Sequence, residues 1–141
     1  MKHKSERSAG GIVYKPAGDE TMWLITQHSE HKGWGFPKGL IGDNNANESM
    51  EEAALREVKE EGGVVAVIRN HDPIETVYSY KYADMLVDKK VSYFLMEYES
   101  GDPNDHDWEV SEAKFVTEDD VMKTLTYTAD KDAFMKILNV M

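Results

Sequence analysis

The feature that most constrains this chain is a glutamate-rich helix, predicted to begin near residues 47–49 and to end at Gly62 and Gly63. Ser49 and Glu52 have the spacing of a capping box, in which two side chains satisfy backbone N–H groups at a helix start. A glycine commonly ends a helix because it adopts the left-handed conformation without steric cost. Both ends of this helix are therefore marked in the sequence.

The second half of this helix directs carboxylates toward the protein body. At ~100° per residue, the apolar residues fall on one side within an arc of roughly 140°; they are Met50, Ala53, Ala54 and Val58. Glu57, Glu60 and Glu61 fall inside the same arc. Because unpaired carboxylates facing a protein interior are costly and repel one another, a cation is expected among them.

The composition limits which cation this is. The chain has no cysteine, so thiolate metal sites, disulfides and a cysteine nucleophile are excluded. A hard divalent ion bound by oxygen fits best, namely Mg²⁺ with Mn²⁺ as a substitute. Such an ion binds phosphate oxygens and lowers the pKa of a bound water. The competing interpretation is a solvated surface helix, with Arg56 placed to pair with Glu52 and Glu60.

The helix carries a motif that identifies a family. The spacing is Gly42-x5-Glu48-x7-Arg56-Glu57-Val58-Lys59-Glu60-Glu61-Gly62-Gly63-Val64. It matches every fixed position of the Nudix box, so the chain resembles a Nudix hydrolase. The resemblance implies a single Nudix hydrolase domain over residues 1–141 with an α/β/α sandwich, in which helices flank a mixed β-sheet.

The pattern of the remaining chain is compatible with that fold. Runs rich in β-branched and aromatic residues predict strands at 8–14, 22–26, 64–69, 74–80, 91–98 and 113–116, and threonine caps predict helices over 117–125 and 128–138. A long glycine- and asparagine-rich loop at 31–47 is the kind of segment that compact domains keep for function.

The resemblance also implies roles for individual residues. It makes Glu57, Glu60 and Arg56 catalytic and Glu57, Glu60, Glu61 and Gly39 metal-binding, with Arg56 orienting a glutamate. Which glutamate is the general base stays open, with Glu57 slightly favoured. Glu48 is a weaker candidate.

One departure from the family pattern concerns the loop before the helix. Gly39 lies three residues too early for the first glycine of the box, and Gly42 takes that position. This predicts a lengthening of the loop around 40–45. It leaves open which backbone carbonyl in the loop completes the metal shell.

Within the family, three segments look like those of diadenosine polyphosphate hydrolases; they are 34–39, 91–95 and 125–127. The similarity implies an asymmetric diadenosine tetraphosphate hydrolase in which Lys38 contacts phosphate and Tyr93 stacks on adenine, although Tyr93 also suits an ordinary sheet position. Glu109 and Glu112 are further candidates for metal ligands, in an acidic stretch that also suits a solvated loop.

Two kinds of alternative remain open. One keeps the chemistry and changes the substrate to a nucleoside triphosphate, a diphosphoinositol polyphosphate or a capped RNA end. An RNA end should leave a basic track, and none is evident in the sequence. The other is a catalytically silent module that binds nucleotides, which typically loses box residues that this chain retains.

The charge and the absence of long apolar runs set the expected surroundings. A formal charge of −11 disfavours duplex nucleic acid and anionic membranes as partners. No stretch approaches ~18 apolar residues, so a cytoplasmic protein without a membrane span is expected. The expected partner is a small nucleotide, and the protein is expected to be a monomer or a homodimer.

Overall fold

A computed structural model describes residues 2–42 and 45–141. The elements follow the order β1 (Lys2–Ala17), β2 (Glu20–His28), β3 (Trp34–Gly35), β4 (Lys38–Leu40), α1 (Met50–Gly62), β5 (Val64–Tyr82), β6 (Met85–Gly101), the 3-10 turn η1 (Pro103–Asp105), β7 (Val110–Thr117), α2 (Glu118–Thr124) and α3 (Thr128–Val140). The loop lengthening expected around 40–45 includes residues 43 and 44, which lie outside the described residues.

The strands form one mixed sheet. Its main path is β3-β2-β1-β6-β5, with β4 paired to β1 and β7 paired to β2. The β1–β6 pair is parallel and the other pairs are antiparallel. The predicted strands at 64–69 and 74–80 are one strand, β5, whose register against β6 shifts between Ile68 and Ile74.

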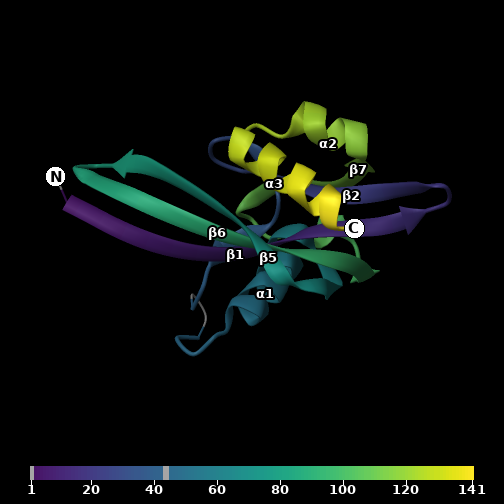
Figure 1. The fold of residues 1–141 in the computed structure, drawn as a ribbon, viewed down its shortest axis with the longest axis horizontal. Helices are drawn as coiled ribbons and strands as arrows, with labels where there is room; N and C mark the ends of the chain where they lie inside the picture. Colours follow the sequence, from purple (N-terminus) through teal and green to yellow (C-terminus); the bar gives the residue numbers. More distant parts are fainter. Residues whose placement is uncertain (1, 43–44) are drawn as a thin grey trace.

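Helices cover both faces of this sheet, α1 on one side and α2 with α3 on the other (Figure 1). Two buried clusters fill the layers. Val58 of α1 packs with Val13 and Phe94, and Phe134 of α3 packs with Trp23 and Phe36. The predicted α/β/α sandwich is therefore confirmed.

The ends of α1 follow the sequence signals. Ser49 and Glu52 form the complete capping box, and Gly63 has a left-handed φ of 73° while its N–H donates to the Lys59 carbonyl at 3.0 Å. A Cβ atom at Gly63 would overlap the Asp102 carbonyl oxygen. The helix register is thus held at both ends.

Three strands extend beyond the helices as an arm. It consists of residues 2–7 of β1, 76–82 of β5 and 85–90 of β6 with their turn, and the N-terminus lies at its far end (Figure 1). None of the described helices is long and apolar enough to span a membrane.

Candidate active site

The second half of α1 brings two of its three predicted glutamates into the interior. Glu57 is 5% exposed and Glu61 is 9% exposed. The side chain of Glu60 is 39% exposed and lies on the flank of the helix beside Arg56. The inward direction expected for all three therefore holds for Glu57 and Glu61.

Glu57 lies directly against Gly39. β4 holds Gly39 opposite Ala9 of β1, and a Cβ atom at Gly39 would overlap Glu57 Oε2. Only glycine leaves room for the carboxylate at this position. The structure thus brings together Glu57 and Gly39, two of the predicted metal ligands, from segments 18 positions apart in the sequence.

Glu61 is fixed by the backbone of the same loop. Its Oε1 accepts a hydrogen bond from the Lys38 N–H at 3.1 Å. Burial raises the pKa of Glu61 to about 8, and the negative charges of Glu57, Glu109 and Asp107 add to this rise. A pKa raised in this way marks a place where negative charge is concentrated and where a bound cation would be favoured.

Arg56 holds the surrounding carboxylates. Its Nε donates to Glu48 Oε2 at 2.7 Å and its Nη2 to Glu48 Oε1 at 3.0 Å, a bidentate pair. Its Nη1 lies 3.1 Å from Glu60 Oε2 and 3.4 Å from Glu57 Oε2, and its Nη2 also donates to the Leu40 carbonyl. Arg56 therefore connects the start of the helix, its glutamates and the β4 loop.

Two lysines and a tyrosine lie next to the carboxylates. The Lys38 Nζ donates to the Tyr78 hydroxyl at 3.5 Å and lies 5.4 Å from the Tyr78 ring centroid. Burial and the charge of Lys38 lower the pKa of Lys89, while the charges of nearby carboxylates, including Glu61 and Glu57, act in the opposite direction. Lys89 was considered from the sequence only as one of several basic residues that could supply positive charge near the substrate, and Tyr78 had no predicted role.

A second aromatic group comes from the loop after β2 and the segment before α3. The His31 Nδ1 accepts a hydrogen bond from the Gly33 N–H at 3.1 Å, and the Tyr127 hydroxyl lies 3.3 Å from the same nitrogen. Burial, with the positive charges of His28 and Lys38, lowers the pKa of His31. The neutral form of His31 suits these contacts, because a protonated Nδ1 could not accept them.

Tyr93 does not lie where a base could stack. Its ring has 0% exposure and packs edge-on against Phe36, with ring centroids 5.7 Å apart. Its hydroxyl donates to Asp130 Oδ1 of α3 at 2.9 Å. A fully buried ring offers no face to a ligand, so the prediction of adenine stacking by Tyr93 is not met in this structure.

The two downstream glutamates differ in position. Glu109 lies close enough to raise the pKa of Glu61 through its charge. Glu112 forms an ion pair with Lys114 at 3.3 Å, and its side chain is 51% exposed. Of the two, Glu109 is therefore the one near the carboxylates of α1.

The donor set fits a hard divalent cation with an incomplete protein shell. Among residues 2–42 and 45–141, no three carboxylate or imidazole groups converge as a finished ligand set. Glu57 and Glu61 are nevertheless buried beside a loop whose glycine leaves space for a carboxylate. Buried carboxylate oxygens of this kind suit a hard divalent cation.

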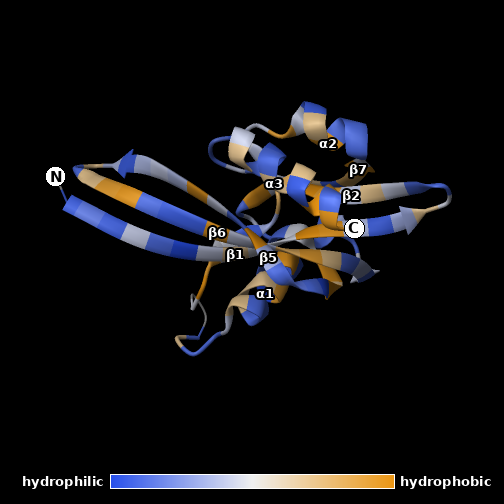
Figure 2. Ribbon diagram, viewed as in Figure 1, coloured by the Kyte–Doolittle hydropathy of each residue, from blue (hydrophilic) through white to orange (hydrophobic). Residues whose placement is uncertain are grey.

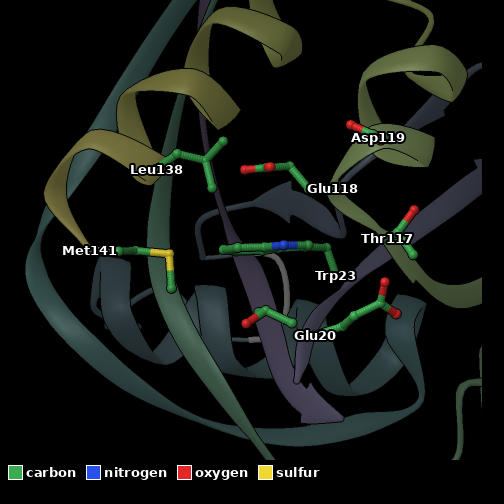
Figure 3. A pocket seen from close by; sticks show the side chains of 8 residues that line it. Glu20, Trp23, Thr117, Glu118, Asp119, Leu138 and Met141 are labelled. Atoms are coloured by element: carbon green, nitrogen blue, oxygen red, sulfur yellow. The ribbon is translucent and has the colours of Figure 1, made fainter. Parts of the chain in front are cut away.

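A separate cavity of about 380 Å³ lies between the β1–β2 hairpin and the C-terminal helices. Trp23 forms its floor, with Leu138 on one side and Glu118 on another (Figure 3). Glu20 adds a further carboxylate to its lining. The cavity shares no residue with the glutamates of α1, so it is not the site described above.

Comparison with known proteins agrees with this geometry. The family model of the NUDIX domain matches residues 4–137. A protein from Mycobacterium tuberculosis named as a mutator protein, MutT4, is 29% identical over 93% of this chain, and the chain spans 54% of that relative's length.

Solved structures share the fold. The Ap4A hydrolase of C. elegans has a TM-score of 0.72 at 21% identity, with 96% of this chain and 98% of that chain covered. The NUDIX domain of Shewanella oneidensis NrtR, solved with ADP ribose, has a TM-score of 0.72 at 20% identity, with 97% and 89% covered. On the family match over nearly its whole length, this chain belongs to the Nudix family.

Proposed function

We propose that this protein is a Mg²⁺-dependent hydrolase of diadenosine polyphosphates that cleaves diadenosine tetraphosphate asymmetrically. The observation that carries the proposal is that Lys38 contacts both a buried carboxylate of α1 and an aromatic side chain of β5. Lys38 donates its backbone N–H to the buried carboxylate of Glu61, while its side chain contacts Tyr78. One residue thus joins a site for a divalent cation to a cationic and aromatic site for a nucleotide.

The carboxylates have separate tasks in this proposal. Glu57, Glu60 and Glu61, with the Gly39 carbonyl, would hold the cation, and Glu109 lies near enough to assist. A bound Mg²⁺ would neutralise charge on the phosphates and lower the pKa of a coordinated water. Arg56 keeps the glutamates in place. The glutamate left least engaged would remove the proton from the attacking water, and Glu57 is the first candidate.

The basic and aromatic side chains favour a substrate with a nucleoside attached to its phosphates. Lys38 and Lys89 supply positive charge in a chain whose formal charge is −11. The partly buried Tyr78, beside Lys38, and the 45% exposed Tyr127 are the aromatic side chains that we expect to contact the bases. The fold shared with the C. elegans Ap4A hydrolase supports the same substrate class.

The test is hydrolysis of diadenosine tetraphosphate with and without Mg²⁺, with products separated by chromatography. Addition of one water across one P–O–P linkage should give ATP and AMP, whereas symmetric cleavage would give only ADP. Glu57→Gln and Glu61→Gln should each lose turnover. Glu99→Gln is the matched control, because Glu99 is an exposed carboxylate at the end of β6 far along the strand from Lys89.

The outcomes separate the substrate from the mechanism. Turnover of a nucleoside triphosphate or ADP ribose, but not of diadenosine tetraphosphate, would show that the proposed substrate is wrong. The proposed roles of the glutamates would still stand. Equal activity of the wild type and the Glu57 and Glu61 variants on every substrate would refute the assignment of these residues.

A further inference from the structure

The cavity between the β1–β2 hairpin and the C-terminal helices has an unsatisfied hydrogen-bond donor at its floor. Trp23 is 2% exposed, and the edge of its indole ring that carries Nε1 is turned toward the opening (Figure 3). Among residues 2–42 and 45–141, no group accepts a hydrogen bond from this N–H. Buried indole N–H groups usually find a partner, and they can only donate. A ligand of this cavity would therefore offer a hydrogen-bond acceptor.

The indole nitrogen can be reached from outside. Among the described side chains, Ser8 Oγ is the one polar atom that is both sealed from solvent and without a hydrogen-bond partner. Because Trp23 Nε1 lacks a partner but is not sealed, some of its surface remains open to the cavity. The indole ring packs edge-on against Phe134, with centroids 5.0 Å apart, and lies 5.8 Å from the ring of Tyr14. These contacts fix the donor in position before a ligand arrives.

Carboxylates surround the opening of the cavity without a matching positive charge. Glu20 comes from the start of β2, and Glu118 and Asp119 come from the first turn of α2. In the described part of the chain, none of the three forms an ion pair with a lysine, arginine or histidine. All three are exposed, so each can meet a ligand at the rim. A cation is therefore attracted to this opening, and the formal charge of −11 on the whole chain adds to the attraction.

Part of the cavity wall is apolar. Leu138 of α3 and Met141, which follows that helix, line the cavity together with Trp23. Figure 2 shows hydrophilic and hydrophobic residues interleaved along α2 and α3, so charged and apolar groups meet at one opening. Such a lining suits a cation on an aliphatic stem, because the methylene groups pack on apolar side chains while the charge stays at the rim.

We propose that this cavity binds a guanidinium group on a short aliphatic stem with a carbonyl beside it, which is the chemistry of an arginine residue. The carbonyl accepts a hydrogen bond from the Trp23 N–H, the stem lies against Leu138 and Met141, and the guanidinium pairs with Glu118 and Glu20. A guanidinium suits this rim better than an ammonium, because it is more weakly hydrated and presents five N–H donors in a fixed fork. The cavity shares no residue with the glutamates of α1, so the proposal does not depend on the proposed function.

Other kinds of ligand fit this cavity less well. Its volume of about 380 Å³ lies at the lower end of the ~300–1,000 Å³ usual for small-molecule sites, and its acidic rim repels phosphate, so a second nucleotide is disfavoured. Among the described residues, no three acidic or histidine side chains are placed to share a metal ion. An uncharged ligand would leave the three carboxylates of the rim without a partner.

The test follows the indole N–H signals of the protein by nuclear magnetic resonance. The chain has three tryptophans, and the variants Trp34→Phe and Trp108→Phe assign the Trp23 signal by elimination. Titration with Nα-acetyl-arginine amide should move the Trp23 N–H proton downfield and saturate, while the signals of Trp34 and Trp108, which do not line the cavity, stay in place. Blocked citrulline has nearly the same shape without the charge and should bind about fivefold more weakly. Ethylguanidinium, which lacks the carbonyl, should compete for the cavity without moving that proton downfield.

Glu118→Gln and Asp120→Asn form a matched pair of variants. Both remove one exposed negative charge from the first turn of α2, but only Glu118 lines the cavity. Glu118→Gln should weaken binding of the blocked arginine about two- to fivefold, as expected for an exposed ion pair, and Asp120→Asn should have a smaller effect. Addition of Glu20→Gln to Glu118→Gln should weaken binding further. Thermal melting of each variant would check folding.

A further probe decides the source of the arginine group. A blocked Gly-Arg-Gly peptide that binds more tightly than the blocked arginine would indicate a partner protein, and equal or weaker binding would indicate a free small molecule.

Three outcomes would overturn the proposal. Blocked citrulline might not move the Trp23 signal less than blocked arginine does, or Glu118→Gln and Asp120→Asn could have equal effects; either result would show that the charge of the ligand is not read by this rim. The third outcome is a Trp23 signal that stays unmoved throughout the millimolar range or that Mg²⁺ alone saturates. None of these measurements involves turnover, so they are independent of the hydrolysis assay.

Discussion

Replacement of Arg56 by Met tests the claim that one guanidinium holds the carboxylates of the site in place. The side chain of Arg56 is 15% exposed and that of its bidentate partner Glu48 is 7% exposed. Arg56 also reaches Glu57 and Glu60. Methionine keeps much of the length and volume of the side chain and removes the charge, so three carboxylates lose their common partner.

The expected loss of stability is large. Removal of one partner from a buried ion pair costs about 3–5 kcal/mol, because the other charge stays buried and unpaired. Since the pair with Glu48 keeps a little exposure, the lower end, about 3 kcal/mol, is expected. For a domain near this size, that corresponds to a fall in Tm of roughly 6–12 °C.

The assay is urea and thermal unfolding followed by circular dichroism, together with hydrolysis rates. Arg56→Lys should recover part of the stability but little activity, because a lysine cannot make the bidentate contact. Arg69→Met is the matched control, since Arg69 forms an ion pair with Glu97 at 2.8 Å but its side chain is 52% exposed. Exposed pairs contribute little to stability.

The reasoning predicts strong coupling between Arg56 and Glu48. In a double-mutant cycle, Glu48→Gln should cost much less in the Arg56→Met background than in the wild type. If Arg56→Met unfolds no more readily than Arg69→Met, or if the cycle shows no coupling, the guanidinium does not organise this site.

Three further predictions concern single positions. Gly39→Ala should displace the Glu57 carboxylate, because the added Cβ atom would overlap Glu57 Oε2. Kinetic assays should show that kcat falls at least tenfold, and thermal melting should show little change in Tm. An unchanged kcat would contradict the close packing of Gly39 against Glu57. Burial raises the pKa of Asp130, so the folded state binds its proton more tightly and wild-type stability falls as pH rises from about 4 through the folded pKa. Asp130→Asn, which still accepts from the Tyr93 hydroxyl, should therefore gain stability relative to wild type over that range in urea titrations, and a constant difference would argue against the shift. Gly63→Ala should destabilise by about 1–3 kcal/mol, because φ is 73° and a Cβ atom would overlap backbone; a Tm within 1 °C of wild type would be inconsistent with that conformation.

The sequence predicted helix α1 well because its signals are local. The capping box of Ser49 and Glu52 and the terminal Gly63 lie within one turn of the ends that they define. The family motif lies on the same helix, so the sequence alone predicts Glu57 and Glu61 as site residues, and both are buried in the structure. The flank position of Glu60 depends on packing against the sheet, which a helical wheel does not contain.

The strands were predicted less well because their ends depend on distant partners. β1 was expected over 8–14 and runs over 2–17. Its first residues are polar and have no alternating pattern, and they become a strand only through pairing with residues 85–90 of β6.

Tyr93 and Tyr78 illustrate a further limit. An alternating strand pattern separates its residues into two sets but does not say which set faces solvent or ligand. Tyr93 lies over the core beneath α3, and its hydroxyl binds Asp130, 37 positions later. Tyr78 contacts Lys38, 40 positions earlier. Both outcomes depend on tertiary contacts that no local pattern contains.

The pairing of β1 with β6 also affects how the chain can fold during synthesis. β1 is synthesised before its parallel partners, which lie 83 positions later, from Lys2 with Met85 to Tyr14 with Glu97. Such distant contacts slow folding because the intervening chain must be ordered before they form. The backbone groups of β1 that face β6 therefore stay unpaired until β6 has been made, whereas β2 and β4 can pair with β1 earlier. In this interval the unpaired edge of β1 can pair with the wrong strand or with another chain. Chaperone binding would be most useful to the protein at this stage, because it would prevent such pairing.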